Sequence, residues 1–136
     1  MIRIYSKKCE YAIRTLSSVS RNISGGSFSL RSVCRQAKTP EWSTRKTLQA
    51  LVHNGILIAK PGPGGGYRFK VSPDKISVLE LILAVDGETA FEKCILGYAS
   101  CGHYNPCVLH GIWKKAKTVL VSELDSSNLV QIMEKK

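Results

Sequence analysis

The sequence predicts a mainly α-helical fold that carries one small β-hairpin. Apolar residues recur at helical spacing in three successive segments within residues 6–52. Beyond residue 55 the period changes, and Tyr67, Phe69 and Val71 alternate with two basic residues. Residues 60–66, one lysine followed by prolines and glycines, separate two apolar runs and could not form a helix. Three helices followed by a basic hairpin with a glycine-rich tip predict a winged helix-turn-helix.

Each helix of this domain is marked by apolar residues spaced three or four apart. The first is expected over residues 6–22, with the stripe Ala12, Ile13, Leu16, Val19 and Ile23. The second is short and has the stripe Leu30, Val33, Cys34 and Ala37. The third runs over about 41–52 on Leu48, Leu51 and Val52, with Thr39 as its expected cap, Pro40 at its first position and Asn54-Gly55 as its end. Residues 56–59 and 67–71 supply the two strands.

The second half of the chain predicts further helices around a cysteine-containing loop. Ser77 and Glu80 fit a capping box that opens a helix ending near Val85, and residues 88–111 are irregular. A long helix over 112–124 and a last short one follow. The long helix has more apolar surface than so small a domain can cover, which predicts dimerisation through Ile112, Trp113, Ala116, Val119, Leu120 and Leu124. We expect two units, residues 1–75 and residues 76–136.

The positive charge of the chain belongs to its first half. The 136 residues carry a formal net charge of +10, but residues 1–75 hold 14 basic and 3 acidic side chains, whereas residues 76–136 hold 6 and 7. This asymmetry favours a polyanionic partner, nucleic acid before a membrane. No apolar run approaches the ~20 residues needed to cross a bilayer, and the first residues lack the apolar region of a signal peptide. With an odd number of cysteines, five, we expect reduced thiols in the cytoplasm.

The basic residues of the third helix and of the hairpin predict contacts with double-stranded DNA. The glycine run is not a nucleotide-binding loop, because it leads into a strand and lacks Gly-Lys-Ser/Thr. As a wing it would reach phosphates or a minor groove through Lys60, Gly64, Gly65 and Arg68, although a plain surface hairpin is the alternative. The third helix would present Ser43, Thr44, Arg45 and Lys46 to base edges, and Arg31 adds charge from the second helix. Trp42 suits either packing or DNA contact.

Three cysteines in the irregular loop predict a metal or cluster site. Cys94, Cys101 and Cys107 are separated by six and five residues, whereas zinc sites prefer tight Cys-x2–4-Cys pairs. Longer gaps suit an iron–sulfur cluster, because the loop must span several irons. Glu10 and His110 are the candidates for a fourth ligand, and His103 is a further option. We favour Glu10 slightly, because a carboxylate on the first helix would couple the site to the DNA-binding half.

The remaining two cysteines are interpreted as structural. Cys34 lies on the apolar stripe of the second helix, and Cys9 is expected to be an inert, half-buried thiol. The sequence contains neither Gly-x-Ser-x-Gly nor His-Glu-x-x-His, and nothing builds a substrate pocket around the loop cysteines. We therefore expect that the protein is not an enzyme.

Several stretches of the chain match the motifs of one family. They are Ser6-Lys7 with Glu10-Tyr11-Ala12-Ile13-Arg14, Gly62-Pro63-Gly64-Gly65-Gly66-Tyr67-Arg68, residues 76–87, the three loop cysteines, Leu109-His110-Gly111-Ile112-Trp113, and residues 124–129. On these residues the chain resembles the IscR/NsrR family of bacterial winged-helix transcriptional regulators, which sense iron–sulfur status, nitric oxide or cysteine metabolism. The resemblance covers nearly the whole chain.

The resemblance implies a homodimer whose long helices cross, and an iron–sulfur cluster, two-iron or four-iron, on the three loop cysteines. In one branch of the family the fourth ligand is a His after the third cysteine, which matches His110. In another it is an acidic residue on the first helix, from either subunit, which matches Glu10. The chain departs from the family in three places. Its first cysteine gap has six residues where five is usual, and Pro61 stands where Arg is common. Arg45 and Lys46 stand at positions often held by Glu and Gln. The operator of a relative is therefore not transferable.

The expected function is a sequence-specific repressor that binds a palindromic DNA operator as a dimer, with an affinity controlled by the cluster as a redox sensor. The alternative is a cluster-free winged-helix regulator controlled by thiol oxidation or by a protein partner, since some members of the family lack the cysteines. A zinc-bound structural protein and a thiol enzyme are weaker alternatives. Metal analysis distinguishes the zinc-bound protein from an iron–sulfur regulator.

Overall fold

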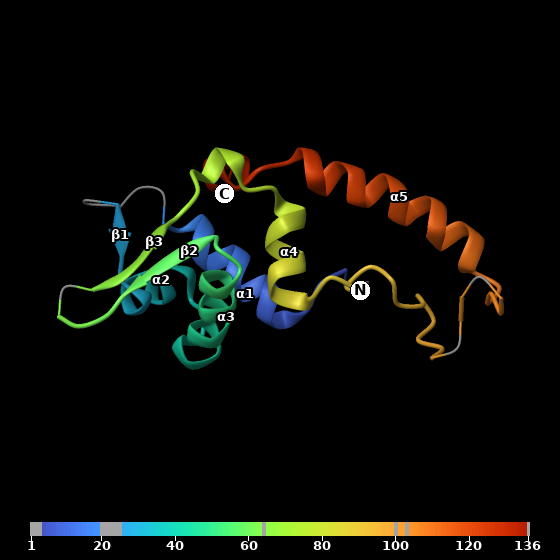
Figure 1. Cartoon of the computed structure of the whole chain (residues 1–136), viewed down its shortest axis with the longest axis horizontal. Helices are drawn as coiled ribbons and strands as arrows, with labels where there is room; N and C mark the ends of the chain where they lie inside the picture. Colours follow the sequence, from blue (N-terminus) through green and yellow to red (C-terminus); the bar gives the residue numbers. More distant parts are fainter. Residues whose placement is uncertain (1–3, 20–25, 64, 100, 103, 136) are drawn as a thin grey trace.

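The computed structural model describes residues 4–19, 26–63, 65–99, 101–102 and 104–135. Its first half contains α1 (Lys7–Ser17), β1 (Ser27–Phe28), α2 (Leu30–Ala37) and α3 (Glu41–His53), followed by a hairpin of β2 (Leu57–Lys60) and β3 (Gly66–Phe69). Figure 1 shows the hairpin projecting from one end of the molecule, beside α2 and α3. The predicted arrangement, mainly helical with a small sheet in a winged helix-turn-helix, is confirmed.

The second half begins with a short 3-10 turn, η1 (Pro73–Lys75), and α4 (Val78–Asp86). An irregular segment then leads to α5 (His110–Ser126) and α6 (Leu129–Lys135). In Figure 1 α5 lies on the side of the molecule opposite the hairpin, and the irregular segment turns back beneath it. The long helix is therefore positioned away from the sheet.

Serine hydroxyls cap three of the described helices. Ser6 Oγ accepts from the amide of Cys9 at 3.1 Å, and Ser29 and Ser77 cap α2 and α4 in the same way. The expected cap of α3 is wrong. Pro40 occupies the cap position without a side-chain bond, while buried Thr39 lies with its Oγ1 2.9 Å from Thr15 Oγ1.

The first helix is shorter than expected, because it ends at Ser17. The hydroxyls of Ser17 and Ser18 both donate to the carbonyl of Arg14, at 2.8 and 3.2 Å. Such side-chain bonds compete with the helical ladder and favour an end at this point. Residues 20–25, which include the expected apolar residue Ile23, lie outside the described residues.

The sheet contains a strand that the sequence pattern does not reveal. The order is β1-β3-β2, and both pairings are antiparallel, with Phe28 opposite Tyr67. Two residues are too few to show a period of two, so β1 had no signal. Its approach requires a glycine at position 66, where φ is +147° and an added Cβ would lie 2.4 Å from the Phe28 carbonyl oxygen.

One hydrophobic core joins the two halves of the chain. Leu16 and Leu48 from the first half pack in the same cluster as Leu81 of α4 and Leu129 and Met133 of α6. By contrast, α5 contains no fully buried residue and contacts the rest of the chain mainly through α4. The core thus fixes the position of α4, whose last residue, Asp86, precedes the cysteine loop. One side of α5 is exposed to solvent.

Candidate nucleic-acid interface and metal centre

The solvent side of α3 is a stripe of four exposed residues at helical spacing. Trp42, Arg45, Lys46 and Gln49 lie at relative positions 0, 3, 4 and 7, which places them on one face. The opposite face is buried and consists of Thr44, Thr47, Leu48 and Leu51. We call the four exposed residues the α3 stripe.

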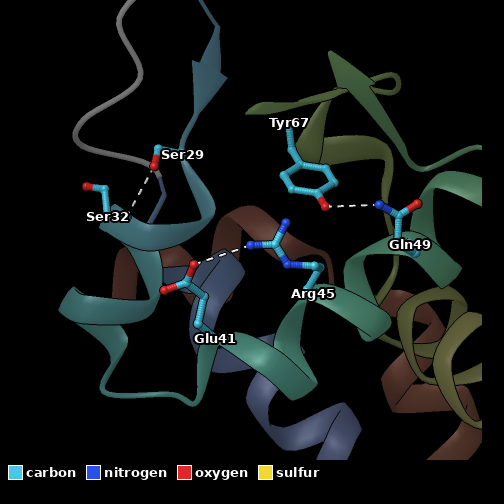
Figure 2. Close-up of polar contacts among 6 residues, drawn as sticks. All are labelled: Ser29, Ser32, Glu41, Arg45, Gln49 and Tyr67. Atoms are coloured by element: carbon cyan, nitrogen blue, oxygen red, sulfur yellow. Dashed lines mark hydrogen bonds and ion pairs between the residues drawn. The ribbon is translucent and has the colours of Figure 1, made fainter. Parts of the chain in front are cut away.

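Each polar residue of the α3 stripe is held by a neighbour. Arg45 Nη2 lies 3.3 Å from Glu41 Oε1, one turn earlier, and Gln49 Nε2 donates to the Tyr67 hydroxyl of β3 at 3.2 Å (Figure 2). The ammonium of Lys46 lies over the Trp42 ring, 4.3 Å from its centroid. The bond between Gln49 and Tyr67 fixes the hairpin relative to α3, so the two elements present one surface.

A groove of about 520 Å³ separates the α3 stripe from the hairpin. Arg31, Arg45 and Lys60 line it from three different elements, and Glu41 is its acidic residue. Arg68 and Lys60 together line a second hollow on the other side of β2. The structure therefore brings three of the predicted basic residues, Arg31, Arg45 and Lys60, to one groove, while Arg68 shares the second hollow with Lys60 and Lys46 lines neither. Concentrated positive charge along such a groove suits a phosphate backbone.

Two predicted DNA contacts on α3 need correction. Thr44 is fully buried, so its side chain faces the core and is not available to bases. Ser43 is half-buried, and its Oγ is enclosed without a hydrogen-bond partner among the described residues. Threonine is tolerated on either face of a helix, and residue type alone could not assign it. The exposed residues Trp42 and Gln49 complete the stripe, and helical spacing from Arg45 would have found Gln49.

The wing glycines have a structural reason. A Cβ on Gly65 would lie 2.0 Å from the Lys60 carbonyl oxygen, and the Gly65 amide donates to Gly62 O at 2.9 Å to close the tip. Gly66 is required by β1, as described above. Gly64 lies outside the described residues. The glycine excess is thus accounted for in part by the tight hairpin itself, and it is weaker support for phosphate contact than expected.

The three loop cysteines converge. Cys94, Cys101 and Cys107 place their sulfur atoms within 4.8 Å of one another, although they lie in an irregular segment. Cys94 Sγ and Cys107 Sγ are 3.6 Å apart, and the amide of Cys107 donates to Cys101 Sγ at 3.3 Å. All three are half-buried and reduced. Among the described residues this is the group of Cys, His, Asp and Glu side chains that could hold a metal ion.

The surroundings of these thiols favour one thiolate. Burial acts to raise the pKa of Cys94, but hydrogen bonds from the backbone at Tyr98 and Leu96 and from the other two thiols lower the pKa to about 7. For Cys101 a backbone bond from Cys107 acts to lower the pKa, but burial and the neighbouring thiols outweigh it, and the pKa is raised. Three thiolates this close repel one another, so a bound cation would stabilise the fully deprotonated set.

Of the candidates for a fourth ligand, His110 is near one of the three thiols, although among the described residues the group that could hold a metal contains only the cysteines. Its Nδ1 lies 3.6 Å from Cys101 Sγ, because α5 begins at His110 directly after the loop. Glu10 is not among the residues brought together with the cysteines, and its carboxylate pairs with Lys7 Nζ at 2.7 Å. His103 lies outside the described residues. Within one subunit the slight preference for Glu10 therefore has no geometric support.

The cysteine loop is connected to α1 through its starting point. A cavity of about 610 Å³ lies between the N-terminus of α1 and the loop, lined among others by Tyr5, Ser6, Asp86, Cys94 and Trp113. The amide of Ser6 donates to Asp86 Oδ2 at 2.8 Å, and Asp86 is the last residue of α4 before the loop. The candidate metal site and the winged-helix domain are thus connected through the contact of Ser6 with Asp86.

The other two cysteines are buried. Cys34 belongs to the hydrophobic core, as expected. Cys9 is fully rather than half buried, and burial, together with the nearby Asp86 carboxylate, raises its pKa to about 12. Both thiols are therefore shielded from solvent, as is typical of structural cysteines, and the raised pKa keeps Cys9 neutral.

The six apolar residues of α5 divide between two faces. Trp113 donates from Nε1 to the Lys93 carbonyl at 3.1 Å, and Leu120 and Leu124 pack against the second core cluster of their own subunit. These three are half-buried within their own subunit and offer less free surface than the other three, and their part in dimerisation stays a prediction. Ile112, Ala116 and Val119 are exposed on the outward side, with Ile112 and Val119 at 69% and 66%. The outward face of α5 is defined here by these three residues.

An exposed basic stripe on the third helix, a wing fixed to it and a triad of thiols in the second half of the chain are the features of one class of protein, the winged helix-turn-helix regulators that bind DNA. The family model Rrf2, iron-dependent transcriptional regulator, matches residues 5–135. The chain belongs to the Rrf2 family, and it is accordingly a transcriptional regulator and not an enzyme. No helix among the described residues is long and apolar enough to span a bilayer.

Known relatives confirm the resemblance to IscR. The HTH-type transcriptional regulator IscR of Aliivibrio salmonicida is 27% identical over 128 residues, which are 94% of this chain and 76% of that protein. IscR of Cronobacter sakazakii is 25% identical, with coverage of 94% and 78%.

Solved structures share the fold. T. potens IscR has a TM-score of 0.72 at 21% identity, covering 95% of this chain and 85% of that one. CymR, the global cysteine regulator of B. subtilis, has a TM-score of 0.77 at 18% identity, covering 100% and 99%.

Proposed function

We propose that the protein is a homodimeric repressor in the cytoplasm whose affinity for DNA is set by an iron–sulfur cluster on Cys94, Cys101 and Cys107. The observation that carries the proposal is the convergence of three half-buried thiols within 4.8 Å. The description of the family as iron-dependent, and the IscR relatives, support iron over zinc. The contact of the loop's starting point with α1 supports a link between the cluster and the DNA-binding half.

The thiols fit a metal bound by thiolates. Metal–sulfur bonds of about 2.3 Å in a tetrahedron hold neighbouring sulfurs about 3.8 Å apart. The distance between Cys94 Sγ and Cys107 Sγ, 3.6 Å, is close to that value, so this pair of thiols suits two ligands of one metal ion. When bound, an iron–sulfur cluster supplies reversible one-electron chemistry and sensitivity to oxidants. The chain contributes the thiolates, the Cys107 amide bond that orients Cys101, and partial shielding from solvent.

His110 is proposed as the fourth ligand. Its ring lies beside Cys101 and is carried by the first residue of a helix, so its position follows from the start of α5. A second copy of the chain could still supply Glu10, which the single subunit does not place at the site. His110→Ala and Glu10→Ala, compared by visible absorption and cluster lifetime, separate the two. The proposal requires that His110→Ala change the spectrum and that Glu10→Ala leave it unchanged.

For DNA, we propose that α3 enters the major groove and that the hairpin contacts the adjacent backbone. The proposed contacts are Arg31, Arg45, Lys46, Lys60, Gly64, Gly65 and Arg68. Thr44 and Ser43 are removed, because the Thr44 side chain is buried and the Ser43 hydroxyl is enclosed. A two-fold dimer through the outward face of α5 would read two half-sites whose centres lie about 34 Å apart or a multiple of it. A palindromic operator follows from that symmetry.

Anaerobic purification with iron and sulfide analysis tests the proposal. We expect a brown protein with visible absorption that each of Cys94→Ala, Cys101→Ala and Cys107→Ala abolishes or cripples. Cys34→Ala is the matched control, since that thiol is in the core, and it retains the cluster. DNA affinity must differ between the loaded and the metal-free protein. A colourless protein that carries stoichiometric zinc, or equal DNA affinity in both forms, contradicts the proposal.

A second candidate function is a regulator switched by thiol oxidation. The 3.6 Å between Cys94 Sγ and Cys107 Sγ favours it, because a small movement would allow a disulfide of about 2.05 Å. In that case the metal-free protein would form a Cys94–Cys107 disulfide with a mild oxidant, and DNA affinity would follow the disulfide. Mass spectrometry after oxidation, beside the iron analysis, distinguishes the two candidates.

A further inference from the structure

Trp42 has its side chain exposed to solvent on the α3 stripe, the face of α3 proposed to meet DNA. It is the second residue of the helix, and 73% of its surface is exposed. Large aromatic side chains normally bury most of their surface. An exposed indole on the same helix face as Arg45 and Lys46 is placed where a ligand of that face would meet it. The residue does not belong to either core cluster, so packing within the subunit does not explain it.

The neighbours of Trp42 indicate what the contact is. Arg45 and Lys46 lie on the same stripe, and the Lys46 ammonium sits over the indole ring at 4.3 Å. A protein interface is depleted of charged side chains at its centre, whereas a surface that meets nucleic acid places cations beside its reading groups. The cation on one part of the ring also restricts the indole, so less freedom is lost when it makes a contact.

We propose that Trp42 is a base-reading residue that contacts the 5-methyl group of thymine in the major groove. That methyl group is the apolar feature that base pairs display there, whereas the other groups on the major-groove edges are hydrogen-bond donors and acceptors. The apolar indole ring can pack against this methyl group, whereas the polar residues of the α3 stripe cannot. Lys46 is a positioning residue for the indole. This inference rests on the proposed role of α3 as the recognition helix.

The test uses full-length protein and a duplex enriched from random sequence by in vitro selection, in whichever metal state binds more tightly. Each thymine of the duplex is replaced in turn by deoxyuridine, which removes only the methyl group. At one or more positions in each half-site we expect affinity to fall about fourfold, the loss of one buried methyl group. Trp42→Ala should weaken binding to the thymine duplex and should no longer distinguish deoxyuridine at those positions. Trp42→Phe, which keeps an apolar ring, should retain part of the discrimination.

Arg45→Ala separates failure of this inference from failure of the recognition-helix assignment. If Arg45→Ala loses affinity while Trp42→Ala binds and discriminates like the wild type, the inference about Trp42 is wrong and the assignment of α3 stands. If neither variant changes binding, the assignment of α3 fails as well. An enriched duplex in which no deoxyuridine substitution changes wild-type affinity also overturns the proposal. Because Trp42 and Arg45 are both exposed, every variant should keep the wild-type unfolding temperature. Thermal unfolding therefore checks that each variant is folded.

Discussion

Ser6 and Asp86, 80 residues apart in the chain, are hydrogen-bonded through both the amide and the hydroxyl of Ser6. Ser6 is also the residue that caps α1, because its Oγ accepts from the Cys9 amide. Asp86 ends α4 and is followed by Gly87, whose φ of +97° turns the chain into the cysteine loop. One side chain therefore joins the start of the first helix to the start of the loop.

Replacing Asp86 should destabilise the protein. Asp86→Ala leaves the Ser6 amide without its acceptor, and loss of a hydrogen bond to a charged group costs roughly 1–3 kcal/mol. Thermal unfolding measures the difference, and Glu88→Ala, which changes an exposed carboxylate nearby, is the control. Equal unfolding temperatures for the two variants would show that the Ser6 contact contributes nothing to stability.

The wing should depend on Gly66. Gly66→Ala places a Cβ 2.4 Å from the Phe28 carbonyl oxygen, so β1 must separate from β3. Strain of this kind typically costs about 1–3 kcal/mol, and DNA affinity should fall on all sequences alike, because the hairpin moves as a unit. Gly111→Ala, where an added Cβ meets nothing within 4 Å, should not lower stability, since alanine is favoured over glycine within a helix such as α5. A Gly66→Ala protein with wild-type stability would contradict the tight pairing of β1.

Adjacent residues of α5 should respond differently to a charge. Val119→Asp changes the outward face and should dissociate the dimer in sedimentation experiments with little loss of monomer stability. Leu120→Asp should instead lower the unfolding temperature, because Leu120 packs within its own subunit. If Val119→Asp remains a dimer, the outward face of α5 is not the interface.

DNA binding should depend strongly on salt. If a dimer neutralises about 6–10 phosphates, affinity should fall by about 10³–10⁵ between 50 and 200 mM salt. Arg45→Ala should change the preferred base, whereas Arg68→Ala should weaken all sequences similarly and lower the salt slope. Fluorescence anisotropy over a salt series measures both. A slope near zero would contradict the assignment of the basic groove to DNA.

The five thiols should fall into two classes in the metal-free, reduced protein. Cys94, Cys101 and Cys107 are half-buried, and the pKa of Cys94 near 7 supplies thiolate at neutral pH. Cys9 and Cys34 are buried, and the raised pKa of Cys9 keeps that thiol protonated. Iodoacetamide at pH 7.5 should therefore modify the loop cysteines first, and Cys9 and Cys34 only on unfolding, as followed by mass spectrometry. Early modification of Cys9 would indicate that α1 opens readily.

Most helices and the hairpin were predictable because their signals are local. The apolar periods of α2 and α3, the capping box at Ser77 and the prolines and glycines around the wing tip act over a few residues, so a local pattern is enough to reveal these elements. The family motifs likewise predicted the convergence of Cys94, Cys101 and Cys107.

Contacts between distant segments were decided only by the tertiary structure. A two-residue strand has no period, so local sequence gives no sign of β1. The strand forms because Phe28 pairs with Tyr67, and Gly66 leaves room for the Phe28 carbonyl. Thr44 is buried where exposure was expected, and Trp42, which the sequence left open, is exposed. Threonine and tryptophan suit either face of a helix, and the packing of the core selects one. The division of α5 at Val119 and Leu120 and the bond from Ser6 to Asp86 depend on how α4 packs. Such contacts follow from the packing of the whole chain, and no local pattern encodes them.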